Sequence, residues 1–329
     1  MARYKVSVIV PIFMVEHFIG KCAKSLLEQT LQDVEFIFVD DDTKDKSLEI
    51  LNDCIIQHPN RIEHVKLLRH KNNKGLPSAR NSGLDIASGQ YIFHCDSDDF
   101  VEPDMLESLY VKAVEANADI VWCDWFLSFK NDERYMSQRY KSTSEDFLRG
   151  MLAGKLKYNV WNKLIKKELY DKNNISFPDG HPLGEDMTIL RLAACAQNVS
   201  YVPRALYHYV KINSNSYTSN LSEKYLSDIH YNVNETIHFI LSHSKLDNIL
   251  NEINFFKLEV KFPFLISKIK SDYRIWGEWY PEANDYILKN PNMSLRRKLL
   301  QFMALKKQFW FVRIHYYLVI KIIYGILYR

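Results

Sequence analysis

Short runs of β-branched and aromatic residues alternate with segments of helical periodicity along the first hundred residues of the chain. The predicted strands cover residues 6–10, 34–39, 65–68 and 91–95. The predicted helices between them cover residues 16–30, 46–56 and 77–87. Strands that alternate with helices of this length form βαβ units. The order of the elements therefore predicts an α/β fold with a doubly wound, mostly parallel sheet.

Acidic or turn-forming residues follow three of these strands directly. They are the turn after Pro11, the acidic run 40–42, and the segment 96–99, which reads Asp-Ser-Asp-Asp. In doubly wound sheets, ligands bind just beyond the carboxyl ends of the strands. We therefore expect the three segments to meet at one binding site.

The segment 96–99 is the main candidate for a metal site. Asp96 and Asp98 are two residues apart, and at the end of a strand this spacing puts both carboxylates on one side. Two carboxylates at one place repel each other, and Mg²⁺ or Mn²⁺ relieves that repulsion while leaving coordination positions for a diphosphate. The alternative is an acidic turn that caps the helix predicted from Pro103.

Two further groups border the same predicted cleft. The three successive acids at 40–42 repel one another unless a base N–H or a ribose hydroxyl uses them. The alternative, an N-cap for the following helix, explains Asp45 better than the acids before it. Arg80 can pair with a phosphate through its planar guanidinium, and its alternative is an exposed helical arginine.

The pattern changes in the second half of the chain. Strands and helices continue to about residue 209, and beyond about residue 222 only helical spacing remains. We therefore predict an α/β domain over residues 1–215 and a helical region over residues 216–329. The five cysteines form no Cys-x-x-Cys pair, which argues against a thiolate zinc site and indicates a reducing, cytoplasmic setting.

The basic charge of the chain is concentrated at its end. From residue 286 onward there are nine Lys and Arg and no Asp or Glu, so the remainder is acidic overall, unlike a general nucleic-acid binder. In the tail, residues 295–329, basic residues gather on one side of a predicted helix and apolar residues on the other. No uncharged run from residue 299 onward exceeds seven residues, so the helix would bind an anionic membrane surface rather than cross it. The alternative is a C-terminal helix packed on its own domain.

Six short motifs occur in an order and spacing that resembles the family 2 glycosyltransferases. They are residues 7–11 (SVIVP), 39–41 (VDD) with Asp45, 79–81 (ARN), 89–92 (GQYI), 96–99 (DSDD) and 184–186 (GED). The resemblance covers about residues 5–215. It implies a GT-A fold, a nucleotide-sugar donor, with a UDP-sugar as the expected one, and transfer with inversion at the anomeric carbon.

The resemblance also implies roles on the donor side for residues that match the motifs. The residues that it assigns to donor binding are Pro11, Phe13, Asp40, Asp41, Arg80 and Asp96. Phe13 would stack on the base beside Pro11, and Asp41, with Asp40, would hydrogen-bond the base. Arg80 would lie against the nucleotide. Asp98 would ligate the metal directly, with Asp96 contacting the ribose or a metal-bound water.

On the acceptor side, the resemblance implies that Asp186 is the catalytic base, with Glu185 next to it. Taken alone, this acid pair also fits the N-terminus of a helix, where it would interact with the helix dipole. Trp161 and Lys163 resemble the acceptor-side segment of the family. His208, late in the same region, is a candidate for an additional metal ligand.

Two residues depart from the pattern of the family. Met14 stands where the family usually has Asn, and Asp42 where it usually has Gly. An Asp can adopt a left-handed turn at modest cost in free energy. Neither departure touches the implied metal ligands or the base, so both bear on the identity of the donor rather than on activity.

Together these features predict a metal-dependent, non-processive hexosyl- or N-acetylhexosaminyltransferase. The Gln-x-x-Arg-Trp run of the processive members is absent, and the implied acceptor is a glycan or a lipid-linked glycan of the cell surface. We expect the protein at the inner face of the cell membrane. One alternative is a sugar nucleotidyltransferase, which would need a glycine-rich loop after the first strand. The other is a degenerate relative that binds a glycan without turnover, against which Asp96, Asp98 and Asp186 argue.

Overall fold

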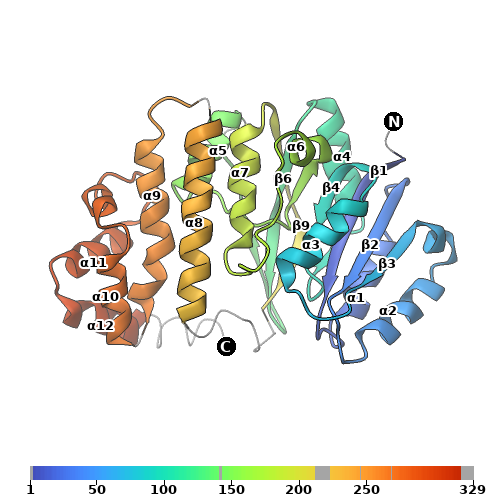
Figure 1. Ribbon diagram of the computed structural model, residues 1–329, viewed down its shortest axis with the longest axis horizontal. Coiled ribbons are helices and arrows are strands. Elements are labelled where there is room, and N and C mark those ends of the chain that lie inside the picture. The colour runs from blue at the N-terminus through green and yellow to red at the C-terminus, as the bar shows by residue number, and fades with distance from the viewer. Residues whose placement is uncertain (1–2, 141–142, 212–222, 245, 268, 320–329) are drawn as a thin grey trace. The chain divides into compact units, whose positions relative to one another are not determined.

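The computed structural model describes residues 3–140, 143–211, 223–244, 246–267 and 269–319, which fold into two compact units (Figure 1). The first unit consists of Met1–Phe147 and Tyr158–Lys245. The second consists of Leu148–Lys157 and Leu246–Arg329. All the predicted donor, metal and base residues belong to the first unit.

The first unit is built around a sheet that has nine strands among the described residues. The strands are β1 (Tyr4–Ile12), β2 (Val34–Asp40), β3 (Val65–Arg69), β4 (Gly89–His94), β5 (Phe100–Val101), β6 (Ile120–Ser128), β7 (Glu133–Met136), β8 (Lys163–Lys166) and β9 (Val199–Val210). Their order is β3-β2-β1-β4-β8-β6-β9-β5, with β7 paired to β6. The first four in this order are parallel, β8 is antiparallel to both neighbours, and β6 is parallel to β9. The prediction of an α/β fold with a mostly parallel sheet is confirmed.

Helices cover both faces of this sheet, since the side chains of β2 are buried from end to end. The helices that begin in this unit are α1 (Ile19–Leu27), α2 (Ser47–Ile56), α3 (Leu76–Ile86), α4 (Met105–Glu115), α5 (Ser144–Leu152), α6 (Lys167–Lys172), α7 (Thr188–Cys195) and α8 (Glu223–His243). Short 3₁₀ helices are η1 (Pro59–His64) and η2 (Glu185–Met187). The four strands and three helices predicted over the first hundred residues are all present, with small shifts at their ends.

Helix α3 lies close against β1, and a glycine makes this contact tight. A Cβ atom built on Gly83 would come 2.5 Å from Cγ2 of Ile9, so any larger residue would push the helix away from the strand. The helix begins after Gly75 with Pro77 in its first turn, a position that needs no backbone N–H. This packing fixes the place of Arg80, three residues before Gly83, beside the ends of β1 and β4.

The second unit is helical in its described part. Its helices are α9 (Leu250–Lys261), η4 (Phe262–Ile266), α10 (Lys270–Glu278), η5 (Pro281–Tyr286), α11 (Leu295–Leu305) and α12 (Phe309–His315). Lys261 is fully buried among them, and its Nζ donates to the carbonyl of Trp279 (2.8 Å) and to Oδ1 of Asn284 (2.7 Å). Among the residues described, no helix combines the length and the apolar character that a membrane crossing requires.

The structure differs from the sequence predictions in two places. The first unit extends along the chain to Lys245 rather than to residue 215, because α8 packs against α7 and η2, and Leu148–Lys157 belongs to the second unit. Strands β5 and β8 were not predicted, since runs of two and four residues carry too short a pattern. The segment after β6 forms a hairpin, in which β7 pairs antiparallel with β6.

Candidate functional site

The predicted binding segments do meet at one edge of the sheet. Ile12 at the end of β1 is paired with Asp40 at the end of β2, and Ile9 of β1 is paired with His94 at the end of β4. Phe13, Asp41 and Asp96 therefore follow three neighbouring parallel strands at their carboxyl ends. This is where ligands bind in doubly wound sheets.

The carboxylates of β2 are buried and organise the surrounding loops. Asp40 accepts hydrogen bonds from the N–H of Thr43 (2.8 Å) and from Nε of Arg69 (3.0 Å). Asp41 accepts from Nδ1 of His70 (2.7 Å) and from the backbone N–H groups of residues 74 and 75 (both 2.8 Å). Asp41 thus ties the loop before α3 to the end of β2, and both acids are held rigidly at the edge of the cleft.

Asp45 binds the start of α2, as the alternative of a cap expected, although the N-cap position itself is Lys46. Asp45 accepts hydrogen bonds from the N–H (3.1 Å) and the hydroxyl (2.6 Å) of Ser47, the first residue of α2. The acids at the end of β2 make no such bonds to α2. The sequence had indicated this difference between Asp45 and the acids before it.

Both residues that depart from the family pattern adopt the left-handed backbone conformation. The φ angle is 53° at Met14 and 65° at Asp42. Asn and Gly adopt the left-handed backbone conformation at the lowest cost in free energy, which explains why the family usually has them at these two positions. The N–H of Met14 donates to Oγ1 of Thr43 (2.8 Å), so the turn is kept despite the substitutions. Next to it, the ring of Phe13 is 41% exposed and available to a ligand.

Arg80 is a buried cation that interacts with the carboxylates of the site. Its side chain is 1% exposed, so the alternative of an exposed helical arginine is wrong. Nη2 donates to Oδ1 of Asp96 (2.8 Å) and lies 3.8 Å from Oε1 of Glu185. Nε and Nη1 are buried and have no hydrogen-bond partner among the described residues. Despite the burial, these carboxylates and that of Asp186 raise the pKa of Arg80, so the guanidinium stays charged.

Hydrogen bonds from β9 hold the turn that follows β4, residues 96–99, in place. The hydroxyl of Tyr207 donates to Oδ2 of Asp99 (2.7 Å) and accepts from the N–H of Asp96 (3.2 Å), and the N–H of Val210 donates to Oδ1 of Asp99 (2.7 Å). Asp99 is buried, whereas Asp96 and Asp98 are half-buried. The alternative of an acidic cap is wrong, because β5 separates this turn from α4, which begins at Met105.

The chemistry of the turn fits a divalent cation shared with a ligand. Burial and the carboxylates of Asp96 and Asp98 raise the pKa of Asp99 well above its usual range, so negative charge is crowded at this point. Asp96 and Asp98 offer the oxygen ligands that Mg²⁺ or Mn²⁺ prefers. In the described part of the chain, however, no three His, Cys, Asp or Glu residues come together in a metal cage. These residues fit a metal whose remaining ligands come from a bound diphosphate.

Both ring nitrogens of His208 lie within hydrogen-bonding distance of a glutamate. Nδ1 lies 2.8 Å from Oε1 of Glu133, and Nε2 lies 2.7 Å from Oε1 of Glu102. The ring also stacks on Phe100, with centroids 4.1 Å apart. In this arrangement His208 joins the β7 hairpin to the segment after β5, and both nitrogens that could ligate a metal are used.

The acid pair of the 184–186 motif lies in η2, directly before α7. Oδ1 of Asp186 accepts from the N–H of Val160 (3.1 Å). Both acids therefore do precede a helix, as the alternative held, but both also interact electrostatically with Arg80. Burial raises the pKa of Glu185 to about 8, with the neighbouring Asp186 adding to the shift. Burial likewise raises the pKa of Asp186 to about 6, against the opposing effect of Arg80.

Trp161 and Lys163, predicted on the acceptor side, follow Val160, whose N–H binds Asp186. Trp161 is buried and stacks on Tyr207, with ring centroids 4.4 Å apart. Lys163 is buried too, and its Nζ donates to the carbonyl of Asn159 (2.7 Å) and to Oδ1 of Asn162 (2.8 Å). Burial lowers the pKa of Lys163 to about 7.

Two supporting residues were not in the predicted set. Tyr207 connects the metal turn to β9, as described above. Asn81 makes reciprocal bonds to Phe177: its Nδ2 donates to the carbonyl (3.0 Å), and its Oδ1 accepts from the N–H (2.8 Å). Asn81 belongs to the motif 79–81, so a signal for it was present in the sequence, but the long-range partners of the two residues were not visible there.

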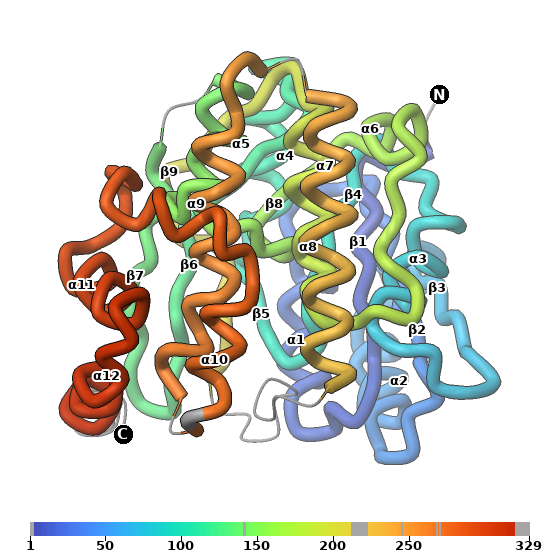
Figure 2. The backbone as a smooth tube through the Cα atoms, turned by 60° about the vertical axis from the view of Figure 1, so that its left-hand side comes forward, coloured from blue at the N-terminus to red at the C-terminus, as the bar shows by residue number. Residues whose placement is uncertain are grey.

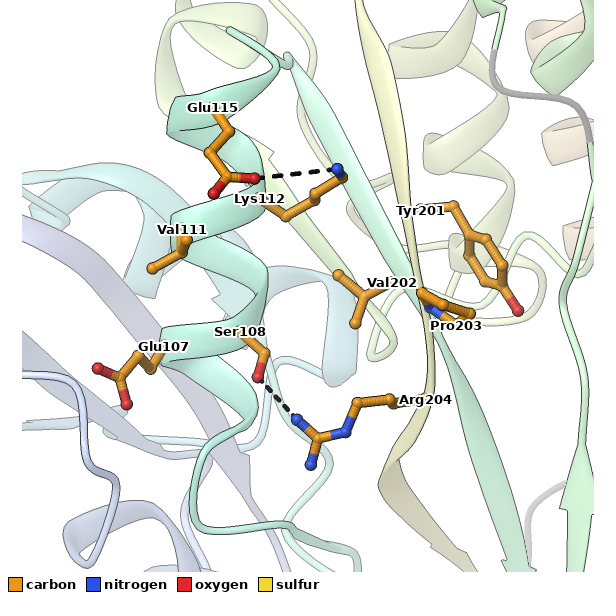
Figure 3. Close-up of a pocket in the computed structure, with 9 residues that line it drawn as sticks. All are labelled: Glu107, Ser108, Val111, Lys112, Glu115, Tyr201, Val202, Pro203 and Arg204. Atoms are coloured by element: carbon orange, nitrogen blue, oxygen red, sulfur yellow. Dashed lines mark hydrogen bonds and ion pairs between the residues drawn. The ribbon is translucent and has the colours of Figure 1, made fainter.

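A hollow on another part of the first unit is separate from these groups. It lies between α4 and β9 and has a volume of about 450 Å³ (Figure 3). Its lining residues are Glu107, Ser108, Val111, Lys112, Glu115, Tyr201, Val202, Pro203 and Arg204. Arg204 donates to Ser108 (3.2 Å), and Lys112 is paired with Glu115 (3.9 Å). None of the predicted donor, metal or base residues lines this hollow.

Comparison with known proteins adds an independent observation. The family model described as Glycosyl transferase family 2 matches residues 7–182. The EpsH protein of Bacillus subtilis is 30% identical over 212 residues, which make up 62% of this chain and 60% of EpsH, so the chain spans less than two thirds of that relative. Staphylococcus aureus TarS 1–349, solved with UDP-GlcNAc, superposes with a TM-score of 0.67 at 20% identity and covers 95% of this chain and 91% of that one. A mannosyltransferase of Pyrobaculum calidifontis, solved with GDP-Man and Mn²⁺, gives a TM-score of 0.54 at 14% identity and covers 94% and 88%. The two solved structures share the GT-A fold predicted for this chain.

Proposed function

The chain belongs to glycosyl transferase family 2, and from this premise we propose that it transfers one sugar from a nucleotide diphosphate donor to a glycan or lipid-linked acceptor of the cell surface, with inversion. The observation that carries the proposal is the position of Arg80. Its buried guanidinium contacts Asp96 on the donor side and lies 3.8 Å from Glu185 on the acceptor side. One charged group thus joins the two halves of a single reaction site.

On the donor side, the nucleotide would lie across the carboxyl ends of β1, β2 and β4. Phe13 offers an exposed ring on which a base can stack, next to the buried Pro11. Asp40 and Asp41 stand at the same edge, where a remaining lone pair of Asp41 would accept from the base. A UDP-sugar is the donor that we propose, in keeping with the UDP-GlcNAc bound by TarS.

Negative charge develops on the diphosphate as its bond to the sugar breaks. Nε and Nη1 of Arg80, which have no partner among the described residues, are the donors of this chain that can stabilise it. Asp98 and Asp96 would hold Mg²⁺ or Mn²⁺, which supplies further positive charge to the leaving group. The Mn²⁺ bound by the mannosyltransferase supports this assignment.

On the acceptor side, we assign the base to Asp186. Its carboxylate would take the proton of the acceptor hydroxyl as the hydroxyl oxygen bonds to the anomeric carbon and the nucleoside diphosphate leaves. One displacement inverts the anomeric centre. Asp186 loses its proton at lower pH than Glu185, so at neutral pH it is Asp186 that can accept one. Trp161 and Lys163 would shape the acceptor side from behind.

The membrane partner is proposed from the surface of α12 and the residues after it. Trp310, Ile314 and Leu318 are exposed at helical spacing, with Arg313 beside them. The opposite side packs within the second unit, where Val312 is fully buried. The packing predicted by the alternative therefore exists, but it leaves a basic and apolar stripe uncovered. We propose that this stripe contacts an anionic surface at the inner face of the cell membrane.

The experiment that tests the reaction is a donor panel. The protein is incubated with Mn²⁺, one nucleotide sugar at a time and a mixture of glycan acceptors, and the released nucleotide is identified. Nucleoside diphosphate, formed only with acceptor present, supports the proposal. Pyrophosphate from a sugar phosphate and a nucleoside triphosphate would instead indicate a nucleotidyltransferase. Binding of a glycan without release of any nucleotide from any donor would indicate the degenerate relative.

A further inference from the structure

The loop that leads into the acid pair is held by a helix far along the chain. Nδ2 of Asn232, in α8, donates to the carbonyl of His181 (3.0 Å) and to the carbonyl of Leu183 (2.7 Å). The ring of His181 stacks on Tyr231, with centroids 3.9 Å apart and planes 17° apart, and its Nδ1 donates to Asp228 (3.0 Å). Four contacts therefore join α8 to His181 and Leu183, which lie three residues and one residue before Gly184.

These residues of α8 form one side of the helix. Asp228, Tyr231 and Asn232 are spaced at i, i+3 and i+4, the positions that lie together on a helical surface. Asn232 is 3% exposed, so both of its donors act without competition from water. The helix also packs on η2 itself and on α7, and α7 and α8 lie side by side in both views (Figures 1 and 2).

Gly184 shows how tightly the loop is fitted. Its φ angle is 88°, a conformation that favours glycine, and a Cβ atom there would lie 3.2 Å from Met187 and 3.6 Å from Cβ of Asn232. The chain turns at Gly184 directly into η2. Asp186 lies three residues after Leu183 and five after His181, so a displacement of the loop at either residue would also move Asp186.

From this arrangement we propose that α8 positions the acceptor-side acids, with Asn232 and Tyr231 as positioning residues for Asp186. The inference rests on the proposed role of Asp186 as base. The match to the family model ends at residue 182, whereas α8 spans Glu223–His243, so the positioning element is supplied by chain beyond that model. Neither residue contacts the donor side, which β1, β2, β4 and α3 form.

The main test is the substitution Asn232→Leu, which keeps the size of the side chain and removes both donors. We expect kcat to fall about tenfold to a hundredfold, because a shift of about 1 Å in a reacting group costs that much. The Kd of UDP, measured by calorimetry as the donor-side probe, should change by less than about threefold. Hydrogen–deuterium exchange should increase in the peptide over residues 181–187 and stay unchanged over residues 91–102. Asn234→Leu, on the exposed side of the same helix, is the matched control and should match the wild type.

A second variant tests the proposal independently in case Asn232→Leu does not fold. Tyr231 is 43% exposed, so Tyr231→Ala should fold, increase exchange in the same peptide and lower kcat, whereas Tyr231→Phe keeps the stacking ring and should restore both. Unchanged kcat and exchange in Asn232→Leu and Tyr231→Ala would overturn the proposal. So would a parallel loss of UDP affinity and kcat, since a general loss of structure moves both. The exchange measurement needs no turnover, so a wild type that transfers no sugar would contradict the proposed function and not the contacts of α8.

Discussion

Glu185 and Asp186 are neighbours in the sequence, but their surroundings give them different chemistry. Glu185 lies nearer the guanidinium of Arg80, and Asp186 is bound by the N–H of Val160. Burial raises the pKa of Glu185 to about 8 and that of Asp186 to about 6, so Asp186 is the more acidic of the two. A pair of carboxyl groups with separated pKa values is typical of sites that move protons. The residues of this site can therefore be tested one at a time.

Asp186→Asn tests the base. The amide has almost the same shape as the carboxylate but cannot take a proton, so sugar transfer should fall by about two to four orders of magnitude while donor binding persists. Transfer rates and the calorimetric affinity for UDP measure the two effects. A parallel fall in rate and affinity would assign Asp186 a structural role instead.

The pH dependence of the wild type tests the same assignment. Burial raises the pKa of Asp186 to about 6, and only the deprotonated carboxylate accepts a proton. The transfer rate should therefore be constant above about pH 7 and fall as the pH drops through 6, approaching a tenfold loss per unit. Initial rates at saturating donor between pH 5 and 8 show this limb. A rate that stays flat down to pH 5 would contradict the assignment.

Asp98→Ala tests the metal ligand. Removing one carboxylate leaves Asp96 and the diphosphate without the shared cation, so donor turnover should be lost. The wild type in excess chelator should lose activity in the same way and regain it with Mn²⁺. Asp85→Ala, an exposed acid of α3, is the control and should keep full activity. If the wild type stayed active in excess chelator, the assignment of Asp98 as a metal ligand would be wrong.

At the scale of elements, the sequence predicts best the parts that are buried on both sides. The centre of β2, residues 36–39, is a continuous apolar run because neither face of this strand meets water. The amphipathic spacing of α1 matches the residues that it buries. Strands β5 and β8 escape prediction because they exist only through pairing with β9, β4 and β6. Short segments of this kind are selected by tertiary contacts rather than by local pattern.

The candidate site shows the same division between local and long-range information. The acids after β2 and β4 could be placed from the sequence, since a strand end fixes where they point. The burial of Arg80 could not, because it follows from the contact of Gly83 with β1. The link between Asn232 and the loop before Gly184 spans about fifty residues and has no sequence signature. Residue types could be predicted, but the partners that position them could not.

At the scale of the whole molecule, the proposed reaction site and the proposed membrane contact belong to different units of the chain. All the predicted donor, metal and base residues lie in the first unit, whereas the uncovered basic and apolar stripe lies in the second. A truncation that removes α12 would be a poor test of that stripe. Phe309 stacks on Tyr273 (5.7 Å) and Val312 is fully buried, so the truncated unit would expose its own core. Surface substitutions keep this packing.

The double substitution Trp310→Ser and Ile314→Ser removes two exposed apolar groups and leaves the buried side of α12 intact. Each basic residue near an anionic surface adds about 1 kcal/mol, so wild-type binding to phosphatidylserine vesicles should weaken at high salt. The apolar groups add insertion that salt does not screen, and their loss should lower co-sedimentation at every salt concentration. Turnover of a soluble acceptor should stay unchanged, since the reaction site lies in the first unit. Leu241→Ser, an equally exposed apolar residue of α8, is the control and should sediment as the wild type does. Equal sedimentation of the double variant and the wild type would refute the membrane contact.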